Sequence, residues 1–219
     1  MPAIDRRPVA AAVVACIAAL ETAVADWEMN RKEFSKAIAA AIAAAQQRAA
    51  PPPPVVYGSL TGMHNALIRL SDTAAATPTC MPTLQRSQHC HSLDAALDAF
   101  ASVTLASCSA INRLHTWINL DSRHNPWLLE QPLLITLHAD DVFHSLESVR
   151  DRFSAQLQLN AFLVHAICPP PHVVPMPDAA ISADCIRLRS IAALQPLLEL
   201  PHLNQQLQLL RAEATPLLQ

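Results

Sequence analysis

Histidine and acidic side chains are concentrated in the segment HADDVFH, which contains His138, Asp140, Asp141 and His144. Imidazoles and carboxylates of this kind can bind a divalent metal or transfer protons. On a helix, however, His138 and His144 lie about 120° apart around the axis and about 9 Å apart along it, so they cannot close on one ion. Asp140 and His144 are four residues apart and can pair. The segment therefore predicts a local Asp–His contact, with no catalytic residue, metal ligand or bound cofactor.

A second group, QHCHS, places His89, Cys90 and His91 side by side, with Cys80 ten residues earlier. Adjacent residues cannot all face one metal, and the spacing to Cys80 fits no common zinc finger. The six cysteines, at positions 16, 80, 90, 108, 168 and 185, form no C-x-x-C motif. Their even number permits disulfides, but a chain of 219 residues is larger than the small secreted domains that disulfides hold together. We therefore expect reduced cysteines and a cytoplasmic location.

Glycine is the most unusual feature of the composition, with 2 residues where average usage would give about fifteen. Phosphate-binding loops, dinucleotide-binding motifs and nucleophile elbows all need glycine, so this scarcity excludes them and predicts a mainly helical fold. The two glycines, Gly58 and Gly62, fit either close helix packing or a helix-entry turn. A net charge of −3 and an aromatic content of 4% argue against binding to nucleic acid.

A long helix is predicted over residues 8–49, because apolar positions recur there with alternating spacings of four and three. This pattern is typical of a heptad seam. The seam consists of Val13, Ile17, Leu20, Val24, Trp27, Arg31, Phe34, Ile38, Ala41 and Ala45.

The start of this helix can also be interpreted as a signal peptide. Arg6 and Arg7 precede an apolar stretch at residues 9–20, and Ala-Val-Ala at 23–25 resembles a cleavage site. The heptad register continues through that site without a slip, which favours a retained helix. No membrane span is expected, because the apolar stretch ends at Glu21.

The chain contains 18 prolines, which divide the rest of it into further helices. We expect helices from near Ser59, from Ser92 as an N-cap, from Asn125-Pro126 and from Asp178 or Ser182, with an irregular polar connector at 77–91 and a short helix after Pro201. In the helix from Asn125-Pro126, Pro132 marks either a kink or the true start. The expected buried faces are Leu93, Leu97, Phe100, Thr104, Cys108, Ile111, His115 and Ile118; then Ile135, Val142, Leu146, Val149, Phe153, Leu163 and Ile167; then Ile186, Ile191 and Leu194; and finally Leu203, Leu207 and Leu210.

Together these elements predict an all-α fold: a helical bundle with a long N-terminal heptad-patterned helix and proline-rich connectors. Residues 1–50 form the coiled-coil-like helix. Residues 51–91 hold a Pro-rich linker, a short helix and the polar connector, and residues 92–219 form the bundle core. The helices beginning near Ser92 and at Asn125-Pro126 should be the central antiparallel pair.

The expected function is that of a non-catalytic structural or adaptor subunit that binds partner proteins through helix–helix contacts in a homo- or hetero-oligomer. The PPPP stretch at 51–54 is a semi-rigid spacer, which favours an N-terminal helix that faces a partner. The expected partner-binding residues are Ile17, Leu20, Val24, Trp27, Arg31, Phe34 and Ile38. The alternative for the helix is that it folds back and completes the core. The alternatives for the function are an exported or periplasmic helical binding protein, an adaptor or chaperone of a bacterial secretion apparatus and, less favoured, a metal-dependent enzyme.

Overall fold

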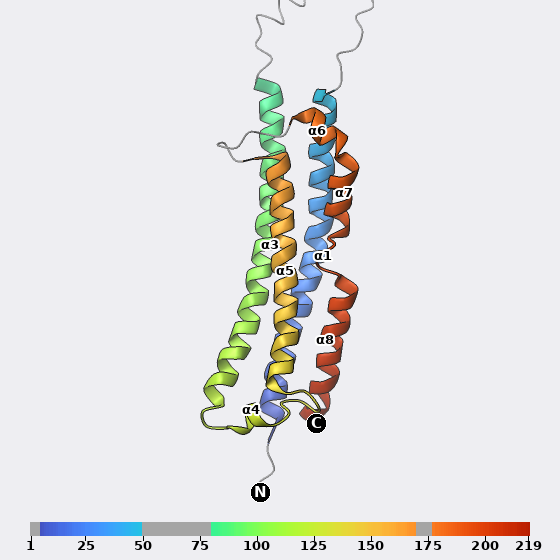
Figure 1. Ribbon diagram of the computed structural model, residues 1–219. Coiled ribbons are helices and arrows are strands. Elements are labelled where there is room, and N and C mark those ends of the chain that lie inside the picture. The colour runs from blue at the N-terminus through green and yellow to red at the C-terminus, as the bar shows by residue number, and fades with distance from the viewer. Residues whose placement is uncertain (1–4, 50–79, 170–176) are drawn as a thin grey trace, which may run out of the picture.

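A computed structural model describes residues 5–49, 80–169 and 177–219, with only the backbone described for 80–87 (Figure 1). The described residues are mostly helical and contain no strand, which confirms the all-α prediction. The helices are α1 (Arg7–Ala49), α3 (Cys80–Asp121), α4 (Trp127–Glu130), α5 (Ala139–Ile167), α6 (Asp178–Ala183), α7 (Cys185–Leu194), α8 (Leu200–Ala214) and the 3-10 helix η1 (Thr215–Leu218). Gly58, Gly62 and the helix expected from near Ser59 lie outside the described residues.

The helices form an elongated up-and-down bundle (Figure 1). α1 and α5 run in one direction, and α3 runs in the opposite direction. α6, α7 and α8 follow one another in line and together take the place of one more long helix, antiparallel to α1. Arg48 near the end of α1 pairs with Asp178 at the start of α6, with an Nε–Oδ2 distance of 2.9 Å.

The central helix is α1, which packs against α3, α6, α7, α8 and η1. α3 and α5 do pack against each other, but α1 makes the more extensive contact with α3, so the expectation that α3 and α5 form the central pair is wrong. Trp27 lies with its ring centroid 4.4 Å from that of Phe100 and 5.0 Å from that of Phe153. Phe34 packs edge-on against Phe100 at 5.5 Å. This aromatic cluster joins α1, α3 and α5.

Helix α3 begins at Cys80, twelve residues before the expected N-cap. The prediction of an irregular connector is therefore wrong for residues 80–91, and Ser92 lies inside the helix, where its hydroxyl donates to the carbonyl of Gln88 at 3.1 Å. Pro82 is tolerated in a first turn, and neither glycine nor proline follows it before the helix ends. The expected buried face is largely confirmed, but His115 is exposed and packs against the ring of Phe143.

The helix expected from Asn125-Pro126 is interrupted. α4 makes a single turn and ends before Pro132, and α5 begins at Ala139. The residue before a proline disfavours the helical region, and Gln131 is accordingly extended with φ −120° and ψ 163°. Ile135 falls in the intervening loop and is 46% exposed, so its expected burial is wrong. The later members of this face, from Val142 to Ile167, are buried as predicted.

The line of helices α6, α7 and α8 is broken twice, at Asp184 and between α7 and α8. Pro201 lies in the first turn of α8, as its sequence position suggests. Leu203, Leu207 and Leu210 are buried as expected. Ile186 and Leu194 are 78% and 74% exposed, which contradicts their expected place in a buried face.

A disulfide joins Cys90 on α3 to Cys168 at the end of α5, with 5.5 Å between the Cα atoms. The expectation of reduced cysteines is wrong for this pair. The free cysteines among the described residues are Cys16, Cys108 and Cys185. Antiparallel packing of α3 and α5 brings together two residues that are 78 apart in sequence. Six cysteines allow fifteen pairings, so the sequence alone cannot select this one.

Among the residues that the structure describes, two helices are long and apolar enough to cross a membrane by length and composition alone, α1 and the Gln88–Asp121 part of α3. Core helices of soluble bundles have the same properties. Both of these helices contribute buried side chains to the bundle core.

Candidate functional site

The residues expected to bind a partner lie in the core of the chain itself. Ile17, Leu20, Trp27, Phe34 and Ile38 are fully buried, and Val24 is 7% exposed. The other helices of the same chain cover them, so α1 folds back and completes the core. The seam is therefore not a free docking surface in the folded chain, and only Arg31 keeps part of its side chain exposed.

Arg31 instead caps the end of α7. Its Nη1 donates to the carbonyl of Ala193 at 2.5 Å, and its Nε donates to Glu28 at 2.9 Å. Ser35, one turn further along α1, donates to the carbonyl of Ala192 at 3.3 Å. The last carbonyls of a helix lack intrahelical donors, and Pro196 removes the N–H that would otherwise face Ala192. The guanidinium of Arg31 thus provides a hydrogen-bond donor for a carbonyl at the end of α7, a helix of the same chain.

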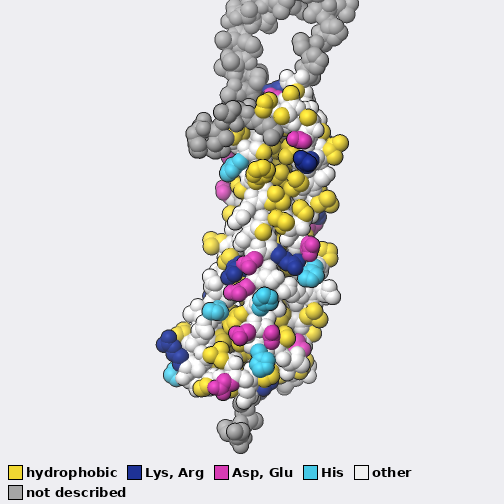
Figure 2. All heavy atoms as spheres, viewed as in Figure 1, with side chains coloured by type: hydrophobic (Ala, Val, Ile, Leu, Met, Phe, Trp, Pro, Cys, Tyr) yellow, Lys and Arg dark blue, Asp and Glu magenta, His cyan; other side chains and the backbone are white. Residues whose placement is uncertain are grey.

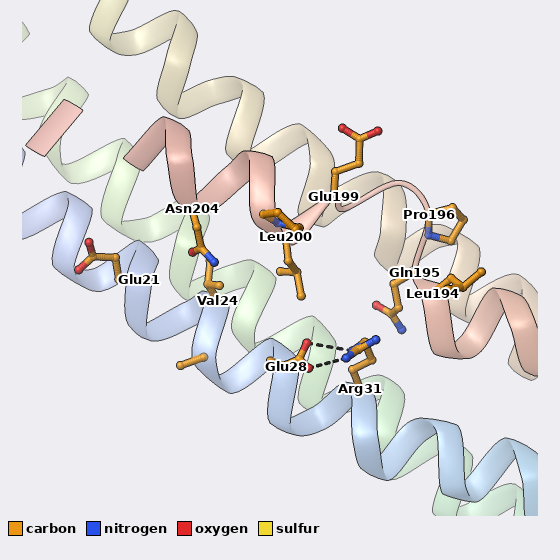
Figure 3. Close-up of a pocket in the computed structure, with 12 residues that line it drawn as sticks. Glu21, Val24, Glu28, Arg31, Leu194, Gln195, Pro196, Glu199, Leu200 and Asn204 are labelled. Carbon is orange, nitrogen blue, oxygen red and sulfur yellow. Dashed lines mark hydrogen bonds and ion pairs between the residues drawn. The ribbon is translucent and has the colours of Figure 1, made fainter. Parts of the chain in front are cut away.

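The break between α7 and α8 opens a cleft of about 870 Å³ against α1 (Figure 3). Leu200 and Asn204 project from α8 toward α1, while Glu28 and Arg31 face each other on α1. Half of the lining side chains are apolar: Val24, Ala25, Leu194, Pro196, Leu200 and Pro201. The other half are polar: Glu21, Glu28, Arg31, Gln195, Glu199 and Asn204.

Two residues with left-handed backbone bracket the break. Gln195 has φ 47° and Glu199 has φ 45°, in a region that non-glycine residues normally avoid. Gln195 ends α7 and donates its backbone N–H to the carbonyl of Ile191, while Glu199 precedes α8. Such backbone persists only where surrounding contacts hold it in place.

Those contacts come from buried amide side chains. The indole Nε1 of Trp27 donates to Oε1 of Gln195 at 2.7 Å, and Nε2 of Gln195 donates to Oδ1 of Asn160 at 3.3 Å. Gln156 donates to the same Asn160 oxygen at 3.0 Å and accepts the backbone N–H of Leu197 at 3.0 Å. Gln156 and Asn160 are fully buried, and Gln195 is 2% exposed. Nδ2 of Asn160 has no hydrogen-bond acceptor among the described residues.

Sequence reasoning missed this network and the cleft in front of it. Gln156 and Asn160 lie four residues apart, on the same face of α5 as Phe153 and Leu163. Two amides at helical spacing within an apolar face were the available signal.

Each carboxylate of the cleft has a basic partner. Glu21 pairs with Arg211 at 2.7 Å, Glu28 pairs with Arg31, and Glu199 pairs with Arg152 at 3.3 Å. Arg152 and Arg211 stand outside the lining, so three carboxylates and one guanidinium border the cleft itself. The side chain of Glu199 is 64% exposed and projects away from α1 (Figure 3). Counted over the lining residues alone, the rim therefore carries more negative than positive charge, which Arg152 and Arg211 balance from outside the lining.

The two histidine-containing groups lie on different helices, HADDVFH at the start of α5 and QHCHS on α3. Asp141 accepts the backbone N–H of His138 at 3.1 Å and thereby closes the start of α5. Asp140 and His144 are both exposed and are not hydrogen-bonded to each other, so the expected contact is wrong. QHCHS lies on α3, where Cys90 is bound in the disulfide. No cluster of three or more histidine, cysteine or acidic side chains that could hold a metal occurs in the part of the chain that the structure describes.

No protein-family model, curated protein or solved structure matches the chain. A functional proposal therefore depends on the geometry of the cleft.

Proposed function

We propose that the protein is a non-catalytic, cytoplasmic adaptor that binds an amphipathic helix of a partner protein in the cleft between α1 and the α7–α8 break. The observation that carries the proposal is the cleft itself, an apolar floor with an acidic rim at the place where the last column of the bundle is broken.

The length of the cleft suits a helical segment. Along α1 its lining runs from Glu21 to Arg31, about 15 Å at 1.5 Å per residue, or nearly three turns of a docked helix. Leu194 is 74% exposed at one end of the break, and Leu200 projects toward α1 at the other. Apolar residues of a partner at positions i, i+3 and i+4 can fill such a groove.

The charge of the rim selects the kind of helix. Glu21 and Glu28 lie along α1, and Glu199 lies on the opposite side of the cleft. Lysine or arginine residues flanking the apolar face of a partner helix would complement these carboxylates and raise the association rate. The occupant is therefore an amphipathic helix with a basic border.

Other exposed apolar side chains surround the region. Figure 2 shows hydrophobic side chains concentrated on the half of the visible face that holds α7 and the later part of α5, while charged and histidine side chains concentrate toward the other half. Phe162 and Ile186 are 68% and 78% exposed. These residues can extend an interface whose centre is the cleft.

Site-specific photo-crosslinking in the native host tests the location. A crosslinking amino acid at position 194 should capture a partner segment, whereas the same group at Leu209, which is 62% exposed on α8 outside the cleft, should not. Ala25→Trp should fill the cleft and abolish capture, and Ala18→Trp, on the exposed side of α1 outside the lining, should leave it intact.

The captured segment, made as a peptide, should become helical on binding and bind about tenfold more weakly to Glu199→Lys. Capture that is equal at positions 194 and 209, or unaffected by Ala25→Trp, would contradict the proposal. So would a captured segment that binds without helix formation.

The proposal assigns no catalytic role to HADDVFH. His144→Ala should change the unfolding free energy by less than about 0.5 kcal/mol, because exposed side chains contribute little to stability. Elemental analysis checks the same point: zinc, manganese or iron present at one equivalent in the wild type and lost from His144→Ala would contradict it.

A further inference from the structure

We propose that Cys90–Cys168 is a reversible thiol–disulfide switch that attaches the end of α5 to α3. Cys168 caps α5, donating its backbone N–H to the carbonyl of Val164 at 2.7 Å. Cys90 lies in the third turn of α3, and the two Cα atoms are 5.5 Å apart. Both residues are only half-buried, so a small thiol can reach the bond.

The core of the bundle does not depend on this bond. Phe153, Leu163 and Ile167 hold α5 in the core at 0–4% exposure, next to the long buried stripe of α1. Disulfides are indispensable mainly in small domains that cannot build such a core. The reduced chain should therefore remain a folded bundle, as a switch requires.

The burial of the N-terminal half of α1 favours a compartment in which the disulfide can be reduced and formed again. Val9, Val13, Ile17 and Leu20 are 0–2% exposed core residues, so removal of residues 1–25 as a signal would strip a large part of the core. With that helix kept and the cytoplasmic location proposed above, the pair meets glutathione. Disulfides of cytosolic proteins are usually transient and redox-sensing.

The exchange needs only a glutathione-type thiol–disulfide couple. In the closing direction one protein thiolate attacks glutathione disulfide, forming a mixed disulfide and releasing one glutathione thiolate. The second protein thiolate then displaces the other glutathione. Two protein thiols are oxidised, one glutathione disulfide becomes two glutathione thiols, and the reverse sequence opens the bond.

Opening the bond loosens a defined region. Asn160 lies two turns before Cys168 on α5, and its side chain accepts from Gln195 behind the cleft. Reduction leaves Leu163 and Ile167 packed in the core but removes the covalent link at the end of α5, so the last turns, up to this amide network, should open more often. An effect on partner binding rests on the proposed function, and the encounter with glutathione rests on the cytoplasmic location proposed with it, whereas the chemistry of the switch rests on the disulfide itself.

The test uses the full chain without any partner, equilibrated over a series of glutathione to glutathione-disulfide ratios. Alkylation and mass spectrometry should show Cys90 and Cys168 changing together, reversibly, within that series. Hydrogen exchange should be about tenfold faster at residues 160–168 in the reduced form, and unchanged around Trp27 in α1. Cys90→Ser should exchange at the fast rate in every buffer, and Cys185→Ser should behave as the wild type.

Three outcomes would overturn the switch. The pair could resist reduction at every ratio, which would identify a permanent staple and favour an oxidising compartment. It could fail to oxidise at any ratio. Finally, reduction could abolish the helical circular dichroism of the whole chain. None of these results bears on whether the cleft binds a partner helix.

Discussion

At the scale of single residues, the buried amides are the least expendable polar groups of the bundle. Gln156→Leu keeps a side chain of similar size but removes the acceptor of the Leu197 N–H and a donor to Asn160. Unpaired buried polar groups cost about 1–3 kcal/mol each, so urea unfolding should show a loss of that size.

Gln158→Leu is the matched control, because Gln158 is exposed on the same helix. It should change the unfolding free energy by less than about 0.5 kcal/mol. Equal effects of the two substitutions would mean that the amide network contributes nothing to stability.

Cys16 makes stability depend on alkaline pH. Burial raises the pKa of its thiol from 9.0 to about 11, while the positive charge of Arg113 acts in the opposite direction. Above pH 9 the unfolded thiol releases its proton and the folded thiol retains it, so the unfolded state binds fewer protons and stability falls as pH rises. The unfolding free energy should drop by about 2 kcal/mol between pH 9 and pH 11. Cys16→Ala should lack this part of the slope, and identical slopes in urea titrations of both proteins would refute the assignment.

At the scale of elements, the break between α7 and α8 depends on a residue with left-handed backbone, Glu199. A left-handed backbone costs a non-glycine residue about 1–2 kcal/mol, and glycine avoids this cost at an entropic loss of about 0.5–1 kcal/mol. The Glu199 side chain is 64% exposed, so its ion pair with Arg152 contributes little to stability. Glu199→Gly should therefore raise the unfolding free energy by up to about 1 kcal/mol in thermal and urea unfolding.

Gln205→Gly is the control, and it should lower the unfolding free energy. Gln205 is an exposed residue within α8, where glycine should cost about 1 kcal/mol. A loss of stability in Glu199→Gly as large as that in Gln205→Gly would show that the left-handed backbone is not a strain on the fold.

The same elements show what sequence can and cannot establish. Uninterrupted four–three spacing predicts α1 almost to the residue, because helical periodicity is a local property of the chain. Whether Trp27 and Phe34 face a partner or the chain's own helices is not local, since a coiled coil and an intramolecular bundle use the same apolar stripe. The cleft follows from which turn of α1 lies opposite the break, and that depends on the packing of the whole chain.

At the scale of the whole molecule, α1 is the core of the bundle. Leu20 is fully buried, so Leu20→Ala should cost about 2–5 kcal/mol in urea unfolding. Leu209→Ala, at an exposed position of α8, should cost less than about 0.5 kcal/mol.

Removing the helix extends the same prediction. A chain without residues 1–50 should aggregate or melt without cooperativity, because α3, α6, α7 and α8 would lose the helix against which they all pack. A soluble, cooperatively melting remainder would instead mean that α1 is an attached arm.

Helix α1 begins at the same end of the bundle at which the chain finishes (Figure 1). Two hydrogen bonds secure this end: Arg6 donates to the carbonyl of Leu134 at 3.2 Å, and the N–H of Thr136 donates to Glu213 at 2.8 Å. A pulling force applied between the first and last residues would therefore not load the antiparallel α1 and α8 along their full length at once. It would separate the two helices turn by turn from this end. The protein should therefore unfold at low pulling force, however large its unfolding free energy is at equilibrium.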